Sequence, residues 1–323
     1  MVEKIKYEIF IFYFQKEYKY RTYTTPMSKG LKPYVALILA GCLFGTISTF
    51  SAMLRDMDVS SFQQSFLRIF FALIYISIIF YYKKINFLIN FEELKYYIFL
   101  GLIMSVLGFF ETTAVVVGTP VAVVILLIYT QPMWTTIFGK IFLKESVDAI
   151  KKLAVFISTA GVFLVSQIWN ISSLNYLGFS ISLICGILLS VDFIMIKELS
   201  LKPKYFLVSI FWFYVFEILF IAILGYLTRI ITDDKIITSF NFSLSVEIWV
   251  IILLSALLPM FFGMILFYTS VKYVPIASAG VILLMEPISG IVYGYFILGE
   301  NVGSFTIIGG ILILFASLLV IKR

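Results

Sequence analysis

Ten apolar segments, each close to the ~20 residues that cross ~30 Å of hydrocarbon, constrain what this chain can fold into. They lie at about 33–54, 61–82, 96–117, 119–139, 152–169, 176–197, 205–228, 248–270, 275–297 and 303–321. With 62 % hydrophobic residues and a mean hydropathy of +1.07, the 323-residue chain has too few polar side chains to cover a soluble globule. The sequence therefore predicts an all-α integral membrane protein with ten transmembrane helices.

The positive charges predict how these helices are oriented. If the N-terminus is cytoplasmic, the inner segments carry 20 Lys and Arg residues and the outer loops carry 3, while Arg68 lies within a segment. Such an excess on one side follows the positive-inside rule. We therefore expect a multi-pass protein of the cell membrane with both termini in the cytoplasm.

Several function classes are excluded by what the sequence lacks. It has no histidine, which removes zinc-protease motifs, imidazole bases and histidine proton relays. It has no G-x-x-x-x-G-K-[ST] motif, so ATP hydrolysis by that route is excluded. The formal charge of +6 is spread over short loops, which argues against nucleic acid as a partner. We expect no enzymatic activity, cofactor or metal, and we interpret Cys42 and Cys185 as small core residues.

The first 32 residues form a basic tail with seven Lys and Arg residues. Its apolar run, Ile9–Phe14, is too short to span a membrane. Met27 directly precedes the stretch SKGLKPYVAL, which leads into the first apolar segment. Two interpretations therefore stay open: a cytoplasmic tail, or an upstream extension before a start at Met27.

One long stretch occurs twice in the chain. Pro275 to Val302 falls without a gap on Pro120 to Val147 when it is shifted by 155 residues, and Gln131 then lies opposite Glu286. The identical positions of the first copy are Pro120, Ala122, Pro132, Gly139, Leu143, Glu145 and Val147. Because the copies are five segments apart, an odd number, the two halves must cross the membrane in opposite directions. We expect two inverted five-helix repeats, residues 33–170 and 171–323.

Three motifs of the second half resemble a known family. FYTSVKYVPIASAG (267–280), MEPISG (285–290) and FILGEN (296–301) resemble the signature of EamA-type transporters of the drug/metabolite transporter superfamily. The first half departs from this signature, since Gln131-Pro132 replaces Glu-Pro and Lys144-Glu145 replaces Gly-Glu. The resemblance implies a carrier for amino acids, their derivatives or similar metabolites, often an exporter. It also implies that the segment at 205–228 is peripheral, which lowers the weight of Glu217.

The strongest candidate for a binding site is Glu286 with the helix-breaking Pro287, because an ionisable group at mid-membrane depth should face the protein interior. It shares a face with Ala279, Ile282, Ser289 and Tyr293, which suggests a cavity wall. The alternative is a structural Glu-Pro pair that binds backbone amides freed at the kink. Pro132 is the corresponding helix break of the first half.

Two further carboxylates are candidates for binding substrate or a proton. Asp192 could pair with Lys197, although the spacing of five residues is poor, or reach the cavity. Glu111 shares a face with Ser105 and Gly108, and its counterpart in the second half is Leu266, so the repeat does not require an acid there.

The other candidates are one cation and a group around Gln131. For Arg68 we favour snorkelling to the outer surface; the alternative is that it neutralises a carboxylate or binds an anionic substrate group. The Gln131 amide could donate to and accept from a solute, and Trp134 could stack on it or simply pack. Glu145 is expected to be a helix cap or gate contact. Small residues, Gly41, Gly45, Gly309 and Gly310, are expected at close helix contacts.

Together these patterns predict a secondary transporter that moves a small, amino acid-like metabolite by alternating access, with the segments at 96–117, 119–139, 176–197 and 275–297 lining a central cavity. The hypothesis includes coupling to protons through a buried carboxylate. An uncoupled facilitator, a membrane-embedded lipid-modifying enzyme and a scaffold are the alternatives. The sequence leaves a homodimer open.

Overall fold

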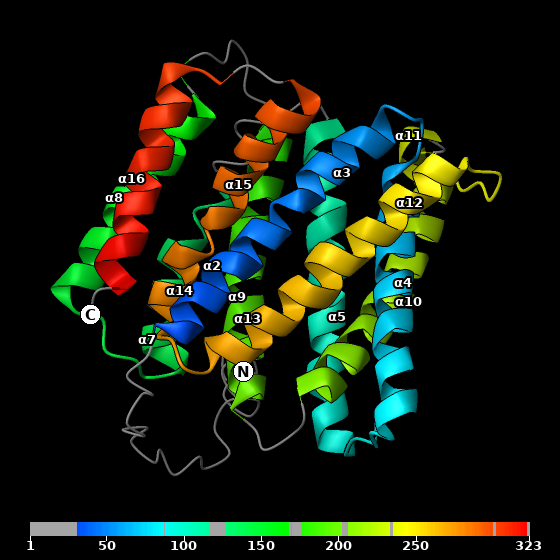
Figure 1. Cartoon of the computed structure of the whole chain (residues 1–323), viewed down its shortest axis with the longest axis horizontal. Helices are drawn as coiled ribbons and strands as arrows, with labels where there is room; N and C mark the ends of the chain where they lie inside the picture. Colours follow the sequence, from blue (N-terminus) through cyan, green and yellow to red (C-terminus); the bar gives the residue numbers. More distant parts are fainter. Residues whose placement is uncertain are drawn as a thin grey trace, which may run out of the picture. The chain divides into compact units, whose positions relative to one another are not determined.

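The computed structural model describes residues 31–86, 88–116, 124, 127–167, 169, 176–201, 206–232, 235–299 and 302–321. All regular structure in these residues is helical (Figure 1). The helices are α2 (Lys32–Phe44), α3 (Thr46–Arg55), α4 (Ser61–Lys83), α5 (Phe91–Val116), α7 (Gln131–Phe142), α8 (Ala149–Ser166), α9 (Tyr176–Ser200), α10 (Phe206–Thr232), α11 (Lys235–Thr238), α12 (Val246–Ser255), η2 (Ala256–Gly263), α13 (Met264–Val271), α14 (Ile276–Ile282), α15 (Met285–Tyr293), η3 (Gly294–Leu298) and α16 (Ser304–Ile321). The two interpretations of the N-terminal tail concern residues that lie outside the described ranges.

Eight helical stretches of the described part are long and apolar enough to cross a bilayer. They are Lys32–Arg55, Ser61–Lys83, Ala149–Ser166, Gly178–Ser200, Phe206–Ile231, Val246–Val271, Ile276–Leu298 and Ser304–Ile321. The predicted segments at 96–117 and 119–139 are not among them. The first is covered by α5, a 26-residue helix, and much of the N-terminal half of the second lies outside the described residues. The count of ten therefore stays a prediction.

Polar caps, rather than the limits of the apolar runs, set several helix starts. α5 begins five residues before the apolar segment, where the backbone N–H of Asn90 donates to the Glu93 carboxylate over 3.3 Å. α8 begins three residues early, because Asp148 accepts from the backbone N–H of Lys151 at 2.9 Å. Such caps satisfy amides that a helix start leaves free, which hydropathy alone does not register.

Both copies of the repeated stretch are interrupted at nearly the same place. In the second copy, α14 ends and α15 begins around a turn at Leu283–Leu284, with Glu286 and Pro287 in the first turn of α15. In the first copy, a turn at Tyr129–Thr130 precedes α7, with Pro132 near its start. A proline is tolerated there because the first helical turn lacks intrahelical acceptors for its N–H groups.

The 155-residue shift also relates whole helices. It maps α8 onto α16 from end to end, and α5 onto the continuous stretch α12–η2–α13. α8 and α16 lie side by side and antiparallel (Figure 1): Gln167 donates to Thr306 at 3.1 Å near one end, while Gly161 lies against Ile313 further along. α4 and α10, second in their halves, are antiparallel too, since Phe80 stacks on Phe211 and Phe62 lies against Gly225.

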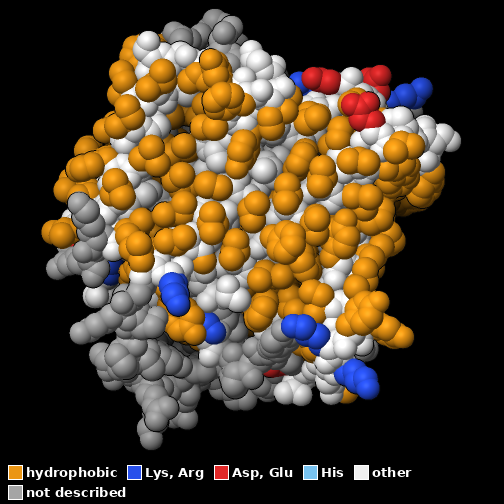
Figure 2. Space-filling model, in the orientation of Figure 1, with side chains coloured by type: hydrophobic (Ala, Val, Ile, Leu, Met, Phe, Trp, Pro, Cys, Tyr) orange, Lys and Arg blue, Asp and Glu red, His pale blue; other side chains and the backbone are white. Residues whose placement is uncertain are grey.

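The surface in Figure 2 is mostly hydrophobic, and its charged side chains gather near two opposite edges. Large apolar side chains are exposed on several helices, with Phe156 73 % and Ile231 79 % exposed. A soluble protein of this size does not expose apolar surface on this scale. Lipid contact accounts for it.

Candidate functional site

Glu286 lies at the start of α15, directly after the helix break, and is half-buried. The hydroxyl of Tyr129, which lies just before α7, donates a hydrogen bond to its carboxylate. Glu111, near the end of α5, interacts electrostatically with both Glu286 and Tyr129. The two helix breaks of the repeat therefore meet at one place, and a carboxylate from each half of the chain is present there.

Arg68 does not extend to the outer surface, so the favoured sequence interpretation was wrong. It is 7 % exposed, and its Nη2 donates to the hydroxyl of Ser51 on α3 at 2.8 Å. It interacts electrostatically with Glu111 and with Glu217 of α10. Partners on three helices interact with the guanidinium, which removes the reason to snorkel.

Asp192 does not pair with Lys197. Lys197 instead forms a 2.6 Å ion pair with Glu145 and donates to the backbone carbonyl of Val274. Asp192 is 3 % exposed, and its Oδ1 has no hydrogen-bond partner. The poor spacing along α9 explains the outcome, because residues five apart do not lie on the same face of a helix.

Glu217 is not peripheral, contrary to what the family resemblance implies for its segment. It is 7 % exposed and interacts electrostatically with Arg68 and Asp192, so this part of α10 faces the interior. Gly101 of α5 lies so close to it that a Cβ at Gly101 would be 2.6 Å from the Glu217 backbone nitrogen. A glycine in mid-helix was the available signal, since it permits such close approach of another helix.

The group around Gln131 contributes to helix packing. Gln131 is 2 % exposed. Its side-chain amide donates to Thr135, and its backbone carbonyl accepts from the hydroxyl of Ser190 on α9 at 3.0 Å. Trp134 donates to Thr130 at 3.2 Å. Tyr293 is half-buried on α15 and interacts with Cys42 of α2. These contacts connect helices and do not extend the charged cluster.

The face of Glu286 is not the open cavity wall that its pattern suggests. Ala279 and Ile282 are fully buried, and Ser289 is 6 % exposed with its hydroxyl 3.4 Å from the carbonyl of Gly41. The reason is the close passage of α2 and α3 along α15, where a Cβ at Gly45 would lie 2.6 Å from the Glu286 carbonyl.

The expectation that Glu145 caps a helix is confirmed. Its Oε2 accepts from the backbone N–H of Ile276 at 2.7 Å, at the start of α14, while its Oε1 holds Lys197. The side chain of Lys197 is 7 % exposed and that of Glu145 is 20 % exposed. We call these contacts the Glu145–Lys197 latch. It joins the α7–α8 loop of the first half to α9 and α14 of the second.

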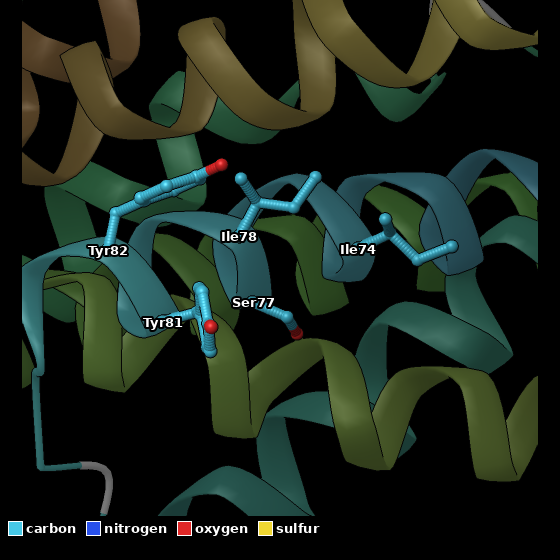
Figure 3. Close-up of a pocket in the computed structure, with 5 residues that line it drawn as sticks. All are labelled: Ile74, Ser77, Ile78, Tyr81 and Tyr82. Atoms are coloured by element: carbon cyan, nitrogen blue, oxygen red, sulfur yellow. The ribbon is translucent and has the colours of Figure 1, made fainter.

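A groove on the surface of α4 is a separate feature (Figure 3). It is lined by Ile74, Ser77, Ile78, Tyr81 and Tyr82, and the two tyrosines are 82 % and 78 % exposed. None of the charged candidates lines it. Its apolar, open character suits contact with lipid chains better than capture of a polar solute.

The charged side chains therefore form one interacting series: Glu286, Glu111, Arg68, Glu217 and Asp192, on α15, α5, α4, α10 and α9. Arg68, Glu217 and Asp192 are buried, Glu286 is half-buried and Glu111 is exposed. Two of the four acids, Glu111 and Glu217, interact with the single guanidinium. At membrane depth such charges are costly unless a partner compensates them, so this set is suited to binding a solute cation or a proton.

Comparisons with known proteins agree with the architecture. The model of the EamA-like transporter family matches the chain twice, at residues 31–167 and 176–322. A solved structure described only as "Crystal structure of protein" aligns with a TM-score of 0.71 and 14 % identity, over 89 % of this chain and 95 % of that chain. At this identity the likeness concerns the fold alone. A search of curated proteins gave no match.

Proposed function

This chain belongs to the EamA-like transporter family and is a multi-pass membrane protein, and on that basis we propose that it is a secondary carrier of small, amino acid-like metabolites. The observation that carries the proposal is the meeting of Glu286, Tyr129 and Glu111 at the two helix breaks. Broken helices of a repeated stretch with polar groups at mid-depth are the usual place of a transporter's binding site.

The proposed architecture has ten spans in two inverted repeats, with both termini in the cytoplasm of a cell-membrane protein. The antiparallel packing of α8 on its repeat mate α16, and of α4 on α10, supports the inversion. The Glu145–Lys197 latch lies at the end of the molecule where the positive-inside rule puts the cytoplasm. Alternating access then requires the cytoplasmic end, closed by the latch, to open and admit the solute. An exporter would release that solute on the outer side of the membrane.

The site favours a solute that carries an amino group. Glu286 and Glu111 provide acceptors for an ammonium, and Arg68 lies next in the series, where it can attract a carboxylate. An α-amino acid has both groups on the same carbon. Tyr129 donates to Glu286 and so orients the carboxylate that would receive the ammonium.

The test is counterflow of labelled amino acids and amines in proteoliposomes that contain the purified protein. The Glu286→Gln variant should weaken the apparent affinity roughly 10–100-fold, because a hydrogen bond to a charged group contributes about 1.5–3 kcal/mol. Glu247→Gln is the matched control, since Glu247 is an exposed acid at the start of α12. It should transport like the wild type.

Two results would contradict the proposal: no counterflow of any amino acid or amine by the wild type, or an unchanged affinity in Glu286→Gln. Counterflow without any response to a pH gradient would identify an uncoupled facilitator and leave the site assignment intact.

A further inference from the structure

A second set of buried polar groups lies deeper in the protein. Asp192 on α9, Glu217 on α10 and Tyr268 on α13 are 3 %, 7 % and 1 % exposed. Each has a side-chain oxygen that is buried without a hydrogen-bond partner: Asp192 Oδ1, Glu217 Oε2 and the Tyr268 hydroxyl. An unsatisfied buried polar atom costs about 1–3 kcal/mol, and more when it is charged, so three together need an explanation.

The three groups act on one another. Asp192 interacts electrostatically with both Glu217 and Tyr268. Two neighbouring tyrosines also face them, but their hydroxyls are engaged: Tyr97 of α5 with Ser209 at 3.0 Å, and Tyr214 of α10 with the carbonyl of Met260 at 2.7 Å. Met260 belongs to η2, an irregular helix around Pro259, and π-helical turns are frequent at functional sites.

Little positive charge is available for two carboxylates here. Arg68 of α4 interacts with Glu217 but is shared with Glu111, and Lys197 on α9 is held by Glu145. Two ionised acids in so dry a place repel each other, whereas a proton on either one removes that repulsion. Among the described residues, no three acidic or sulfur side chains gather as a metal ion would require. A proton is a ligand whose binding relieves the repulsion between these two acids.

We propose that Asp192 and Glu217 share the coupling proton of the transporter, with Tyr268 as the nearby hydrogen-bond donor to the ionised form. This inference rests on the proposed carrier function and assigns the proton to a site separate from the solute-binding carboxylates. Arg68 connects the two sites, because it interacts with Glu111 on one side and Glu217 on the other. A solute carboxylate that draws on Arg68 weakens its hold on Glu217, so solute and proton occupancy depend on each other.

The experiment compares two kinds of transport by the same proteoliposomes: counterflow, which needs only the solute site, and uptake driven by a pH gradient. Asp192→Asn and Glu217→Gln, singly and combined, should keep counterflow within about threefold of the wild type. Accumulation driven by the gradient should be lost, because neutral amides cannot bind and release the proton. The control Glu247→Gln should keep both.

A second measurement follows proton release when solute is added to lightly buffered protein in detergent. The wild type should release protons, and the Asp192→Asn, Glu217→Gln double variant should not. Retention of gradient-driven accumulation and of proton release in that variant would overturn the inference. Wild-type counterflow that ignores the gradient would overturn it too, while the carrier function stands. Absence of counterflow in the wild type would instead count against the carrier function itself.

Discussion

At the scale of single residues, glycines decide how closely helices approach the site. Gly41, Gly45 and Gly309 lie at close contacts, as their place in apolar segments predicts. Gly310 does not: a Cβ there would meet nothing within 4 Å. Neighbouring glycines of one helix face different directions, and the sequence does not say which direction is crowded.

Gly45 and Gly310 therefore provide a matched pair for a test. In Gly45→Ala the new Cβ would lie 2.6 Å from the Glu286 carbonyl and 2.8 Å from the Gly290 nitrogen, both backbone atoms that cannot rotate away. We expect a loss of about 2–3 kcal/mol in the free energy of unfolding, as for other overpacked interiors, and impaired counterflow. The measurement is the thermal unfolding midpoint in detergent, alongside transport.

Gly310→Ala should leave that midpoint unchanged or raise it, since alanine favours helix by about 1 kcal/mol and has room here. Equal behaviour of the two variants would show that α3 and α15 do not pack as closely as described.

At the scale of helices, the Glu145–Lys197 latch replaces a missing intrahelical interaction. The start of α14 follows Pro275, which offers no side-chain cap, and the carboxylate of Glu145 supplies the acceptor from another part of the chain. The same carboxylate neutralises Lys197, which lies within a membrane-crossing helix. The Glu145 side chain thus caps the start of α14 and neutralises Lys197 on α9.

Breaking the latch should destabilise the protein. Lys197→Met leaves Glu145 without its cation, and Glu145→Gln leaves Lys197 charged and unpaired. Removing one partner of a buried pair costs about 3–5 kcal/mol, and the partial exposure of Glu145 favours the lower end of that range. The thermal unfolding midpoint should fall clearly in both variants.

Lys152→Gln serves as the control, because Lys152 is an exposed lysine at the same end of the protein. The double variant Lys197→Met, Glu145→Gln should recover part of the loss, since no unpaired charge remains. A midpoint of Lys197→Met equal to that of Lys152→Gln would be evidence against the latch.

At the scale of the whole molecule, the interacting charged side chains come from both halves of the chain. Glu111, Arg68 and Tyr129 come from the first half, and Glu286, Asp192 and Glu217 from the second. In the proposed inverted arrangement, equivalent helix breaks would meet at mid-depth, although the sequences of the two halves have diverged at most positions.

The inversion can be tested with repeat mates. Ala149 and Ser304 are the first residues of α8 and α16, both are exposed, and the 155-residue shift maps one onto the other. In a background without Cys42 and Cys185, Ser304→Cys should react with an impermeant maleimide on intact cells. Ala149→Cys should react only after permeabilisation. Reaction of both from the same side would disprove the inverted repeat.

Hydropathy and charge predicted the membrane helices because both are properties of short stretches of chain. Helix ends shifted by a few residues where caps such as Asp148 intervened. The charged candidates Glu286, Glu111 and Arg68 were recognised from their cost in lipid, and they do interact. The partners of these side chains were harder to predict. Snorkelling to the outer surface was favoured for Arg68, pairing with Lys197 was one option for Asp192, and Glu217 ranked lower among the site candidates.

The sequence by itself determined that this chain crosses a membrane many times, that its two halves are related, and which charges must be explained. Only the tertiary structure decided which of those charges meet. The physical reason is that the rotation of each helix about its axis is set by its neighbours. Close contacts fix those rotations, for example the contact of Gly45 with α15 and that of Gly101 with α10. Such contacts depend on residues that lie far apart in the chain.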